Sequence, residues 1–430
     1  MLPALSEHRH LRYGTFLALY VAQGLPEGLL YVAVPAWLAQ QGVSAGEIGA
    51  FIGVILLPWS FKLINGSVMD RFSFLPMGRR RPWVISAQVG MIVSLLSLTM
   101  VEDAAAQMSL ITVIGFLVNF FGAFQDVAVD GMAIDIIPEN EQARANGLMW
   151  GGKTLGIALS TALSGVLISV YGLDAGAISI AGAIALIMLV PLLTHERPGE
   201  RLLPWSAGTA STAALELQLH SWRKIFAGLF KVVWTPSSLI FTAAIFIALM
   251  GYGLYTAALP VMAVQELGWA DTDYTSAAAT IGILGAAFAM IGAGSIATRF
   301  GLVRTLVATL ILTAILHWAM TALSSLWDFR AVLLGYMVGF KILFVLMSVA
   351  IYAAAMRLCR REVAATQFAI YMAFVNLGTS AGAALLGLIQ NAADYAGVLI
   401  AMGAIVAVAA LAFGRVNITP PNAKPVGEPL

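Results

Sequence analysis

Long apolar runs, separated by short polar segments, follow one another along the whole of this 430-residue chain. An α-helix needs ~20 mostly apolar residues to cross a bilayer, and each run reaches that length. The pattern therefore predicts an all-α membrane protein with twelve transmembrane helices. The predicted helices cover residues 14–40, 45–66, 81–101, 108–136, 143–170, 175–194, 237–264, 274–298, 302–323, 330–356, 363–390 and 394–414.

The composition agrees with this class and excludes others. Hydrophobic residues make up 60% of the chain and charged residues 10%, whereas soluble domains have about 45–50% and about 25%. The formal net charge of +1 gives no basic surface for nucleic acid. The single cysteine, Cys359, excludes an intramolecular disulfide and a cysteine-based zinc cluster. We expect neither a metal nor another cofactor.

The basic residues predict how the chain is oriented. If the N-terminus is cytoplasmic, nineteen of the 23 Lys and Arg residues fall in cytoplasmic segments, which is the asymmetry that the positive-inside rule describes. We therefore expect both termini in the cytoplasm.

A longer polar stretch divides the predicted helices into six and six. We predict an N-terminal six-helix bundle over residues 1–194, a cytoplasmic linker over 195–236, a C-terminal six-helix bundle over 237–414 and a cytoplasmic tail over 415–430. Within the linker, apolar residues recur at helical spacing over 215–233, with basic residues among them. This amphipathic helix either lies on the anionic inner leaflet or is a plain linker helix.

The two bundles share a repeat at an offset near 228 residues. Gly66-Ser-Val-Met-Asp70-Arg71-Phe72 follows the second helix, and Gly294-Ser-Ile-Ala-Thr298-Arg299-Phe300 follows the eighth. Two six-helix pseudo-repeats in parallel are typical of the major facilitator fold.

The loop after the second helix carries a resemblance to that family. Gly66-x-x-x-Asp70-Arg71, followed by Gly78-Arg79-Arg80-Arg81, resembles the loop between helices two and three of major facilitator transporters. The resemblance implies a cytoplasmic gate in which a carboxylate and an arginine pair and separate as the two halves rock. The candidate gate residues are Asp70, Arg71, Arg79 and Asp135.

Further segments resemble a narrower branch of the family. These are Gly24-Leu25-Pro26, Phe124-Gln125-Asp126 with Asp130-Gly131, Arg144-Ala-Asn146-Gly147 and Ala365-Thr366-Gln367-Phe368-Ala369. Together with the arginine run they resemble AmpG-like muropeptide permeases, acetyl-coenzyme A transporters and some siderophore importers. The resemblance implies that a small solute is carried across the membrane.

Six charged residues fall inside the predicted helices, where each costs roughly 2.5–3.5 kcal/mol at mid-bilayer. They are Glu27, Lys62, Asp126, Asp130, Lys153 and Lys341. Asp126 and Asp130 are four residues apart and share one helix face. Lys153 lies at a matching depth, so an ion pair of either aspartate with Lys153 is one interpretation. An aspartate of the two that is left without an ion pair could instead carry a proton.

Glu27 is the leading candidate for proton coupling. It follows Gly24 and Pro26, which loosen the helix and free backbone groups to face a cavity. Asp126 and Asp130 are the alternative proton carriers. A Glu27–Lys341 bridge between the halves, formed in one state, is a further alternative that is compatible with a coupling role for Glu27.

Polar and aromatic residues near these charges complete the candidate substrate site. Lysines would bind negative groups, amides would form hydrogen bonds, and rings would pack against a sugar or an aromatic ligand. The candidate substrate-binding residues are Tyr20, Gln23, Tyr31, Lys62, Asn119, Gln125, Trp150, Lys153, Lys341 and Asn376.

These features predict a secondary active transporter and not an enzyme. The sequence has no Gly-x-x-x-x-Gly-Lys-Ser/Thr loop for ATP, and its histidines outside the helices have no acid at fixed spacing. We predict a monomeric, proton-coupled importer of an anionic solute such as a muropeptide, in the bacterial inner membrane. A siderophore importer, a lipid flippase and a membrane sensor on the same scaffold are the alternatives.

Overall fold

The structure of the protein is a computed structural model that describes residues 3–216, 236–359 and 364–416. In these ranges most residues belong to helices, and the β-bridge between Ala4 and His195 is isolated. Ten of the described helices are long and apolar enough to cross a membrane. The chain is therefore a multi-pass membrane protein of the all-α class, as its sequence predicts.

The first six predicted spans form what we call the N half. Its helices and helical turns are α1 (Arg9–Gly28), η1 (Leu29–Ala33), α2 (Val34–Gln40), α3 (Ala45–Leu56), η2 (Leu57–Phe61), α4 (Lys62–Arg71), η3 (Leu75–Met77), α5 (Arg81–Leu96), η4 (Ser97–Met100), α6 (Met108–Ile136), α7 (Glu139–Tyr171) and α8 (Leu173–Leu193).

The last six predicted spans form the C half, and the short helix α9 (Thr212–Glu216) lies between the halves in sequence. The helices and turns of the C half are α11 (Pro236–Val261), η5 (Met262–Glu266), α12 (Asp271–Phe288), η6 (Ala289–Ala293), α13 (Gly294–Phe300), α14 (Leu302–Ala322), η7 (Ser324–Leu326), α15 (Arg330–Leu358), α16 (Ala364–Gln390) and α17 (Tyr395–Phe413).

Each predicted span corresponds to a helical segment of the described chain, and the differences lie at the ends. The second span continues to Arg71, because the chain makes the 3-10 turn η2 at Pro58 and then resumes the helix. Most of the predicted linker helix falls on residues 217–235, and the end of the predicted tail falls on 417–430. Both segments lie outside the described residues.

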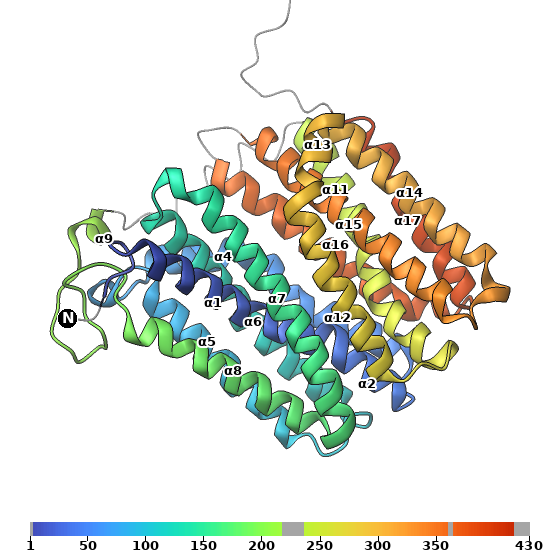
Figure 1. Ribbon diagram of the computed structural model, residues 1–430, viewed down its shortest axis with the longest axis horizontal. Coiled ribbons are helices and arrows are strands. Elements are labelled where there is room, and N and C mark those ends of the chain that lie inside the picture. Colours follow the sequence, from blue (N-terminus) through green and yellow to red (C-terminus); the bar gives the residue numbers. More distant parts are fainter. Residues whose placement is uncertain (1–2, 217–235, 360–363, 417–430) are drawn as a thin grey trace, which may run out of the picture.

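The two halves lie side by side, and the alternation of helix directions places the connections at two ends of the bundle (Figure 1). We call the end that holds Arg9 and Phe413 the tail end. The opposite end, which holds the turns at Gly42 and Asp394, is the hairpin end.

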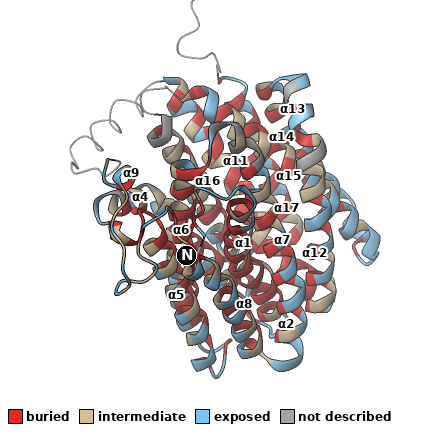
Figure 2. Cartoon of the chain, turned by 60° about the vertical axis from the view of Figure 1, so that its left-hand side comes forward, coloured by how far each residue is buried: buried red, intermediate tan, exposed pale blue. Residues whose placement is uncertain are grey.

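Buried side chains show where the halves are joined. At the hairpin end one continuous apolar cluster contains residues of both halves, for example Ile52 of α3 and Leu386 of α16. At the tail end each half has its own cluster, around Phe16 in the N half and around Phe241 in the C half. Exposed residues lie along the outside of the bundle (Figure 2). The halves therefore share a core at the hairpin end.

Helices α1 and α7 pack backbone to backbone at two glycines. A Cβ on Gly24 would lie 2.2 Å from the carbonyl oxygen of Lys153, and a Cβ on Gly28 would lie 2.3 Å from that of Ile157. Neither position has room for a side chain. Because Glu27 lies between these glycines in α1, the close approach brings it beside Lys153.

Candidate functional site

Four charged side chains meet inside the N half as two ion pairs. Lys153 of α7 binds Glu27 of α1, with 2.8 Å between Nζ and Oε1. Lys62 of α4 binds Asp126 of α6. The four side chains are between 6% and 23% exposed. Each ammonium group therefore compensates a carboxylate at a depth where an isolated charge is costly.

The indole ring of Trp59 lies close to both ammonium groups. Its ring centroid is 4.8 Å from Nζ of Lys62 and 4.9 Å from Nζ of Lys153, within the range of cation–π attraction. The indole N–H lies 2.7 Å from Oδ1 of Asn119 and 2.9 Å from the hydroxyl oxygen of Tyr31. Trp59 thus couples the two ion pairs to a hydrogen-bonded group on α6 and η1.

Trp59 also connects the two halves. Asn376 of α16 donates a hydrogen bond to the backbone carbonyl oxygen of Trp59 at 3.0 Å. Asn376 was a candidate from the sequence, whereas Trp59 was not. The signal that could have found it is its position between Pro58, which interrupts the helix, and the embedded Lys62.

Hydrogen bonds from α1 hold the carboxylates of α6. Gln23 donates to Asp126, and Tyr20 donates to Asp130. Gln125 donates to the backbone carbonyl oxygen of Leu19 at 2.8 Å. The side-chain carbonyl oxygens of Gln23 and Gln125 are buried and accept no hydrogen bond from any described residue. They are free to accept a hydrogen bond from a ligand or a water molecule.

The ion pairs differ from those expected from helix spacing. We expected Lys153 to neutralise Asp126 or Asp130, but it binds Glu27, and Asp126 binds Lys62. The glycine contacts between α1 and α7 place Glu27 beside Lys153, and the turn η2 precedes Lys62 directly. Spacing along one helix fixes which residues share a face, but not which neighbouring helix that face meets.

The C half contains one of the embedded lysines, Lys341. Lys341 of α15 packs its aliphatic chain against Gly285, where a Cβ would lie 2.6 Å from its Cε. Among the described residues Lys341 has no ion pair and no hydrogen bond. The alternative bridge from Lys341 to Glu27 is not formed in this structure, since Glu27 is held by Lys153.

Stacked aromatic rings join α11 to α15 in the same half. Tyr252 stacks on Phe344 with 3.9 Å between ring centroids, and Tyr255 stacks on Phe340 with 3.5 Å. These stacks fix the positions of two tyrosines on α11 that the sequence leaves unplaced.

Two tyrosines of the C half face the charges of the N half. Tyr352 of α15 contacts Trp150 of α7, with 5.7 Å between ring centroids. The hydroxyl groups of Tyr252 and Tyr352 lie within electrostatic range of Glu27 and Lys153. Tyr352 was not a candidate from sequence, because nothing in its local pattern marks it.

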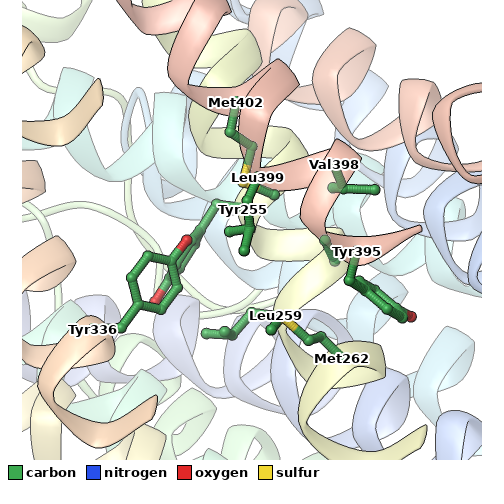
Figure 3. A pocket seen from close by; sticks show the side chains of 9 residues that line it. Tyr255, Leu259, Met262, Tyr336, Tyr395, Val398, Leu399 and Met402 are labelled. Carbon is green, nitrogen blue, oxygen red and sulfur yellow. The ribbon is translucent and has the colours of Figure 1, made fainter. Parts of the chain in front are cut away.

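A small cavity lies elsewhere in the C half, between α11, α15 and α17 (Figure 3). Tyr255 and Tyr336 lie on one side of it, while Met262 approaches it from η5 and Met402 from α17. Its volume of about 10 Å³ is near that of a single water-sized probe. It is too small for a solute, so it is not the substrate site.

The candidate gate residues that can be placed lie within the N half. Arg79 binds both carboxylate oxygens of Asp135, with Nη1–O distances of 2.9 and 3.1 Å. This ion pair links the loop before α5 to the end of α6. Arg71 lies 5.9 Å from the ring centroid of Phe72, and the side chain of Asp70 lies outside the described residues.

Residues 196–211 of the linker contact residues 78–81 at the tail end of the N half. We call these two segments the linker clasp. The buried carboxylate of Glu196 accepts hydrogen bonds from the backbone N–H groups of Arg80 and Arg81 at 3.0 and 3.1 Å. It thereby satisfies two N–H groups at the start of α5 that the helix itself leaves unpaired.

A second buried carboxylate lies beside the first in the linker clasp. Glu200 accepts hydrogen bonds from the Ser211 hydroxyl and the backbone N–H of Arg197, both at 2.9 Å. A Cβ on Gly78 would lie 2.6 Å from Oε2 of Glu196 and 3.0 Å from Oε2 of Glu200. Burial, followed by the charge of Glu196, raises the pKa of Glu200 to about 7.

The charged residues of the site are not arranged for a metal. Within the described residues, no three His, Cys, Asp or Glu side chains come together in a group that could hold a metal ion.

Comparison with protein families gives a match over nearly the whole chain. The model of the Major Facilitator Superfamily matches residues 16–383 and, in a second overlapping match, residues 241–429.

Curated relatives match over shorter or longer stretches. An uncharacterised protein of Haemophilus influenzae is 32% identical over 145 residues, which are 31% of this chain and 34% of that protein. The anhydromuropeptide permease of Escherichia coli is 26% identical over 153 residues, 36% of this chain and 31% of that protein. The chain thus spans about a third of the length of these two relatives. A transporter of Rickettsia conorii named AmpG 4 is 23% identical over 367 residues, 81% of this chain and 83% of that protein.

Solved structures with a similar fold cover almost all of the chain. The nucleoside transporter NupG superposes with a TM-score of 0.68 at 14% identity, covering 94% of this chain and 99% of its own. A POT family transporter in complex with a thioalcohol-conjugated peptide superposes with a TM-score of 0.69 at 14% identity, covering 95% and 97%. At this identity the likeness shows the fold.

Proposed function

Because the chain belongs to the major facilitator superfamily and is a transporter and not an enzyme, we propose that it is a proton-coupled importer of an anionic solute. The similarity to an anhydromuropeptide permease makes a muropeptide the first substrate to test. The observation that carries the proposal is the group of two lysine–carboxylate pairs beside Trp59.

Each ion pair allows a substrate anion to compete with a protein carboxylate for one ammonium group. A substrate carboxylate that binds Lys153 displaces Glu27 from it. The displaced Glu27 is then buried without a counter-charge, which favours its protonated form. Substrate binding on Lys153 is therefore linked to the uptake of a proton by Glu27, and a transporter that binds both together can use a proton gradient.

We assign the coupling to Glu27 because, of the two carboxylates that bind a lysine, it is held by fewer groups. Among the described residues it has Lys153 as its partner, whereas Asp126 is held by both Lys62 and Gln23. Asp130 is held by Tyr20 and remains, with Asp126, the alternative carrier. Fewer interactions must therefore break for Glu27 to leave Lys153 than for Asp126 to leave Lys62.

Lys341 would supply a positive group from the other half. A solute with two negative groups could bind Lys153 in the N half and Lys341 in the C half, and so join the halves around itself. This fits alternating access, in which the two halves rock around a central site. Tyr252, Tyr352 and Trp150 would offer ring faces to the sugar part of such a solute.

The distribution of basic residues supports an orientation with the tail end in the cytoplasm of a bacterial cell, and so a place in the inner membrane. In that orientation the shared core lies on the periplasmic side, and the separate cores lie on the cytoplasmic side. This arrangement fits a state in which the site faces the cytoplasm, where an importer releases its substrate. We propose that the monomer is the transporting unit.

The experiment that tests the proposal is uptake of a labelled anhydromuropeptide into proteoliposomes, with and without an inward proton gradient. We expect accumulation that depends on the gradient in the wild type. In Glu27→Gln we expect gradient-driven accumulation to be lost while exchange of labelled for unlabelled substrate across the membrane persists, because an amide binds no proton.

Asp174→Asn is the matched control, since it makes the same acid-to-amide change at an exposed position at the start of α8. It should leave both measurements unchanged. Gradient-driven uptake that persists in Glu27→Gln would overturn the coupling role of Glu27. Absence of both uptake and exchange for the wild type would overturn the muropeptide as substrate, and binding of other anionic sugar conjugates would then be compared.

A further inference from the structure

An apolar groove opens on the outer side of the N half at the tail end. It has a volume of about 490 Å³, which is within the size range of ligand pockets. Its walls are Ile85 and Ser86 of α5, Leu192 of α8 and Met77 of η3, and its cover is the linker at Leu203, Pro204 and Trp205. No residue of the candidate substrate site takes part in it.

The groove continues the surface that faces lipid. On α5 the side chains of Val89 and Val93 are 45% and 59% exposed, and on α8 those of Leu189 and Leu193 are 46% and 54% exposed. In a membrane protein such apolar exposure is contact with acyl chains. The groove begins where α5 starts and α8 ends, so it lies where the apolar surface meets the polar boundary of the membrane.

The linker is held over the groove by its own hydrogen bonds. Arg81 donates to the backbone carbonyl oxygen of Arg201 at 2.9 Å, and the backbone N–H of Arg201 donates to that of Pro76 at 2.6 Å. The hydroxyl oxygen of Ser206 accepts the N–H groups of Leu202 and Leu203 at 2.9 and 3.0 Å. These bonds leave Trp205 81% exposed at the rim of the groove. The rim lies near the polar boundary of the membrane, where tryptophan is enriched.

Positive charge is concentrated beside the groove. The side chain of Arg201 donates through Nη1 to the carbonyl oxygen of Pro204 at 2.9 Å and through Nε to that of Gly208 at 3.0 Å. Its Nη2 has no hydrogen-bond partner among the described residues. The linker clasp and the helix ends beside it hold more arginines than carboxylates. The five arginines are Arg79, Arg80, Arg81, Arg197 and Arg201, and the three carboxylates are Asp135, Glu196 and Glu200.

We propose that this groove binds an anionic phospholipid of the adjoining leaflet. One acyl chain lies in the groove beneath the linker, and the phosphate lies beside Arg201. The bound lipid would link the linker to α5 and α8. The apolar lining selects an acyl chain, and the excess of arginine selects a negative headgroup over a zwitterionic one.

The test uses the full-length protein in lipid nanodiscs that contain brominated lipid, which quenches tryptophan fluorescence on contact. The difference between the wild type and Trp205→Phe isolates the signal of Trp205 from that of the other tryptophans. We expect brominated phosphatidylglycerol to quench Trp205 at a concentration about fivefold lower than brominated phosphatidylcholine, which corresponds to ~1 kcal/mol for one basic residue near the surface.

Two substitutions separate the groove from the general lipid surface. Ser86→Phe fills the groove and should remove most of the quenching of Trp205, whereas Val93→Phe, on the lipid-facing surface of the same helix, should leave it unchanged. Arg201→Gln should remove the preference for phosphatidylglycerol. Equal quenching by the two lipids would overturn the headgroup selection, and quenching unchanged in Ser86→Phe would overturn binding in the groove.

Discussion

Lys153 and Glu27 show how a charged side chain is accommodated in an apolar bundle. Each would be costly there without the other, and together they are nearly neutral. The nearby Trp59 ring adds cation–π attraction for the ammonium group. In the proposed mechanism the same pair is stable while intact and becomes a binding site for an anion once the carboxylate is displaced.

Removing one partner of this pair should destabilise the protein more than removing both charges. In Lys153→Ala, Glu27 stays buried without a counter-charge, and we expect a loss of ~3–5 kcal/mol of stability. The double variant Glu27→Gln/Lys153→Gln should recover part of that loss. The apparent melting temperature in detergent measures both effects.

The Lys153→Ala prediction has a direct control in the same site. If Lys153 were instead paired with Asp126, as the sequence also allowed, Asp126→Asn would rescue the stability of Lys153→Ala at least as strongly as Glu27→Gln. We expect Glu27→Gln to be the better rescue. Equal stability of Lys153→Ala and the wild type would contradict the pairing.

At this scale the sequence identified the embedded charges but not their partners. Hydrophobic patterning makes Glu27 and Lys153 conspicuous, because any charge in a long apolar run is an exception. Which lysine meets which carboxylate depends on how far each helix is rotated about its axis. That rotation is set by contacts such as Gly24 against α7, and these require the packed structure.

The linker clasp ties a connecting segment to the ends of α5 and α6 through buried charged groups. Arg79 binds Asp135, and Glu196 caps the start of α5. The arginine run after Gly78 therefore takes part in packing, in addition to the orientation that its charge predicts. Its sequence predicted a cytoplasmic segment and a gate, but the contacts with residues 196–211 are long-range and could not be inferred.

Glu200 should make the linker clasp sensitive to pH. Its pKa in the folded protein is about 7, above the ordinary value near 4.5, because of burial and then the charge of Glu196. The folded clasp therefore binds the proton more tightly than the unfolded segment does. Its stability is highest below about pH 4.5 and falls as the pH rises from there to about 7. Over that range the equilibrium constant for forming the clasp falls about tenfold for each pH unit.

Hydrogen–deuterium exchange of the backbone amides in residues 197–211 measures this effect, once rates are corrected for intrinsic exchange. Wild-type protection should be lower at pH 8 than at pH 5.5. Glu200→Gln, which carries no charge, should remove most of this difference and be better protected than the wild type at pH 8. The exposed Glu7→Gln should behave as the wild type. A pH dependence that survives in Glu200→Gln would contradict this assignment.

The whole molecule is held together where the two halves meet at the hairpin end. There α3 and α16 approach so closely that a Cβ on Gly387 would lie 2.7 Å from the Cα of Gly46. Ser380 donates to the backbone carbonyl oxygen of Gly53, and Gln265 donates to that of Ala39 at 2.9 Å. Twelve spans in two repeats were predictable from hydropathy. Which end is sealed was not, because both ends of these helices are similarly apolar.

Opening of the hairpin end requires α3 and α16 to separate, so bulk placed between them should favour the opened arrangement. Gly49→Leu introduces a side chain where a Cβ alone would lie 2.7 Å from the carbonyl oxygen of Ala383. Overpacking of this kind costs ~1–3 kcal/mol, which shifts a two-state equilibrium about 5- to 150-fold. We expect a cysteine at Ser380, in a Cys359→Ser background, to react faster with a membrane-impermeant maleimide in Gly49→Leu.

Gly182→Leu is the control, since a Cβ there meets nothing within 4 Å. Unchanged labelling in a folded Gly49→Leu protein would mean that this contact does not hold the halves closed.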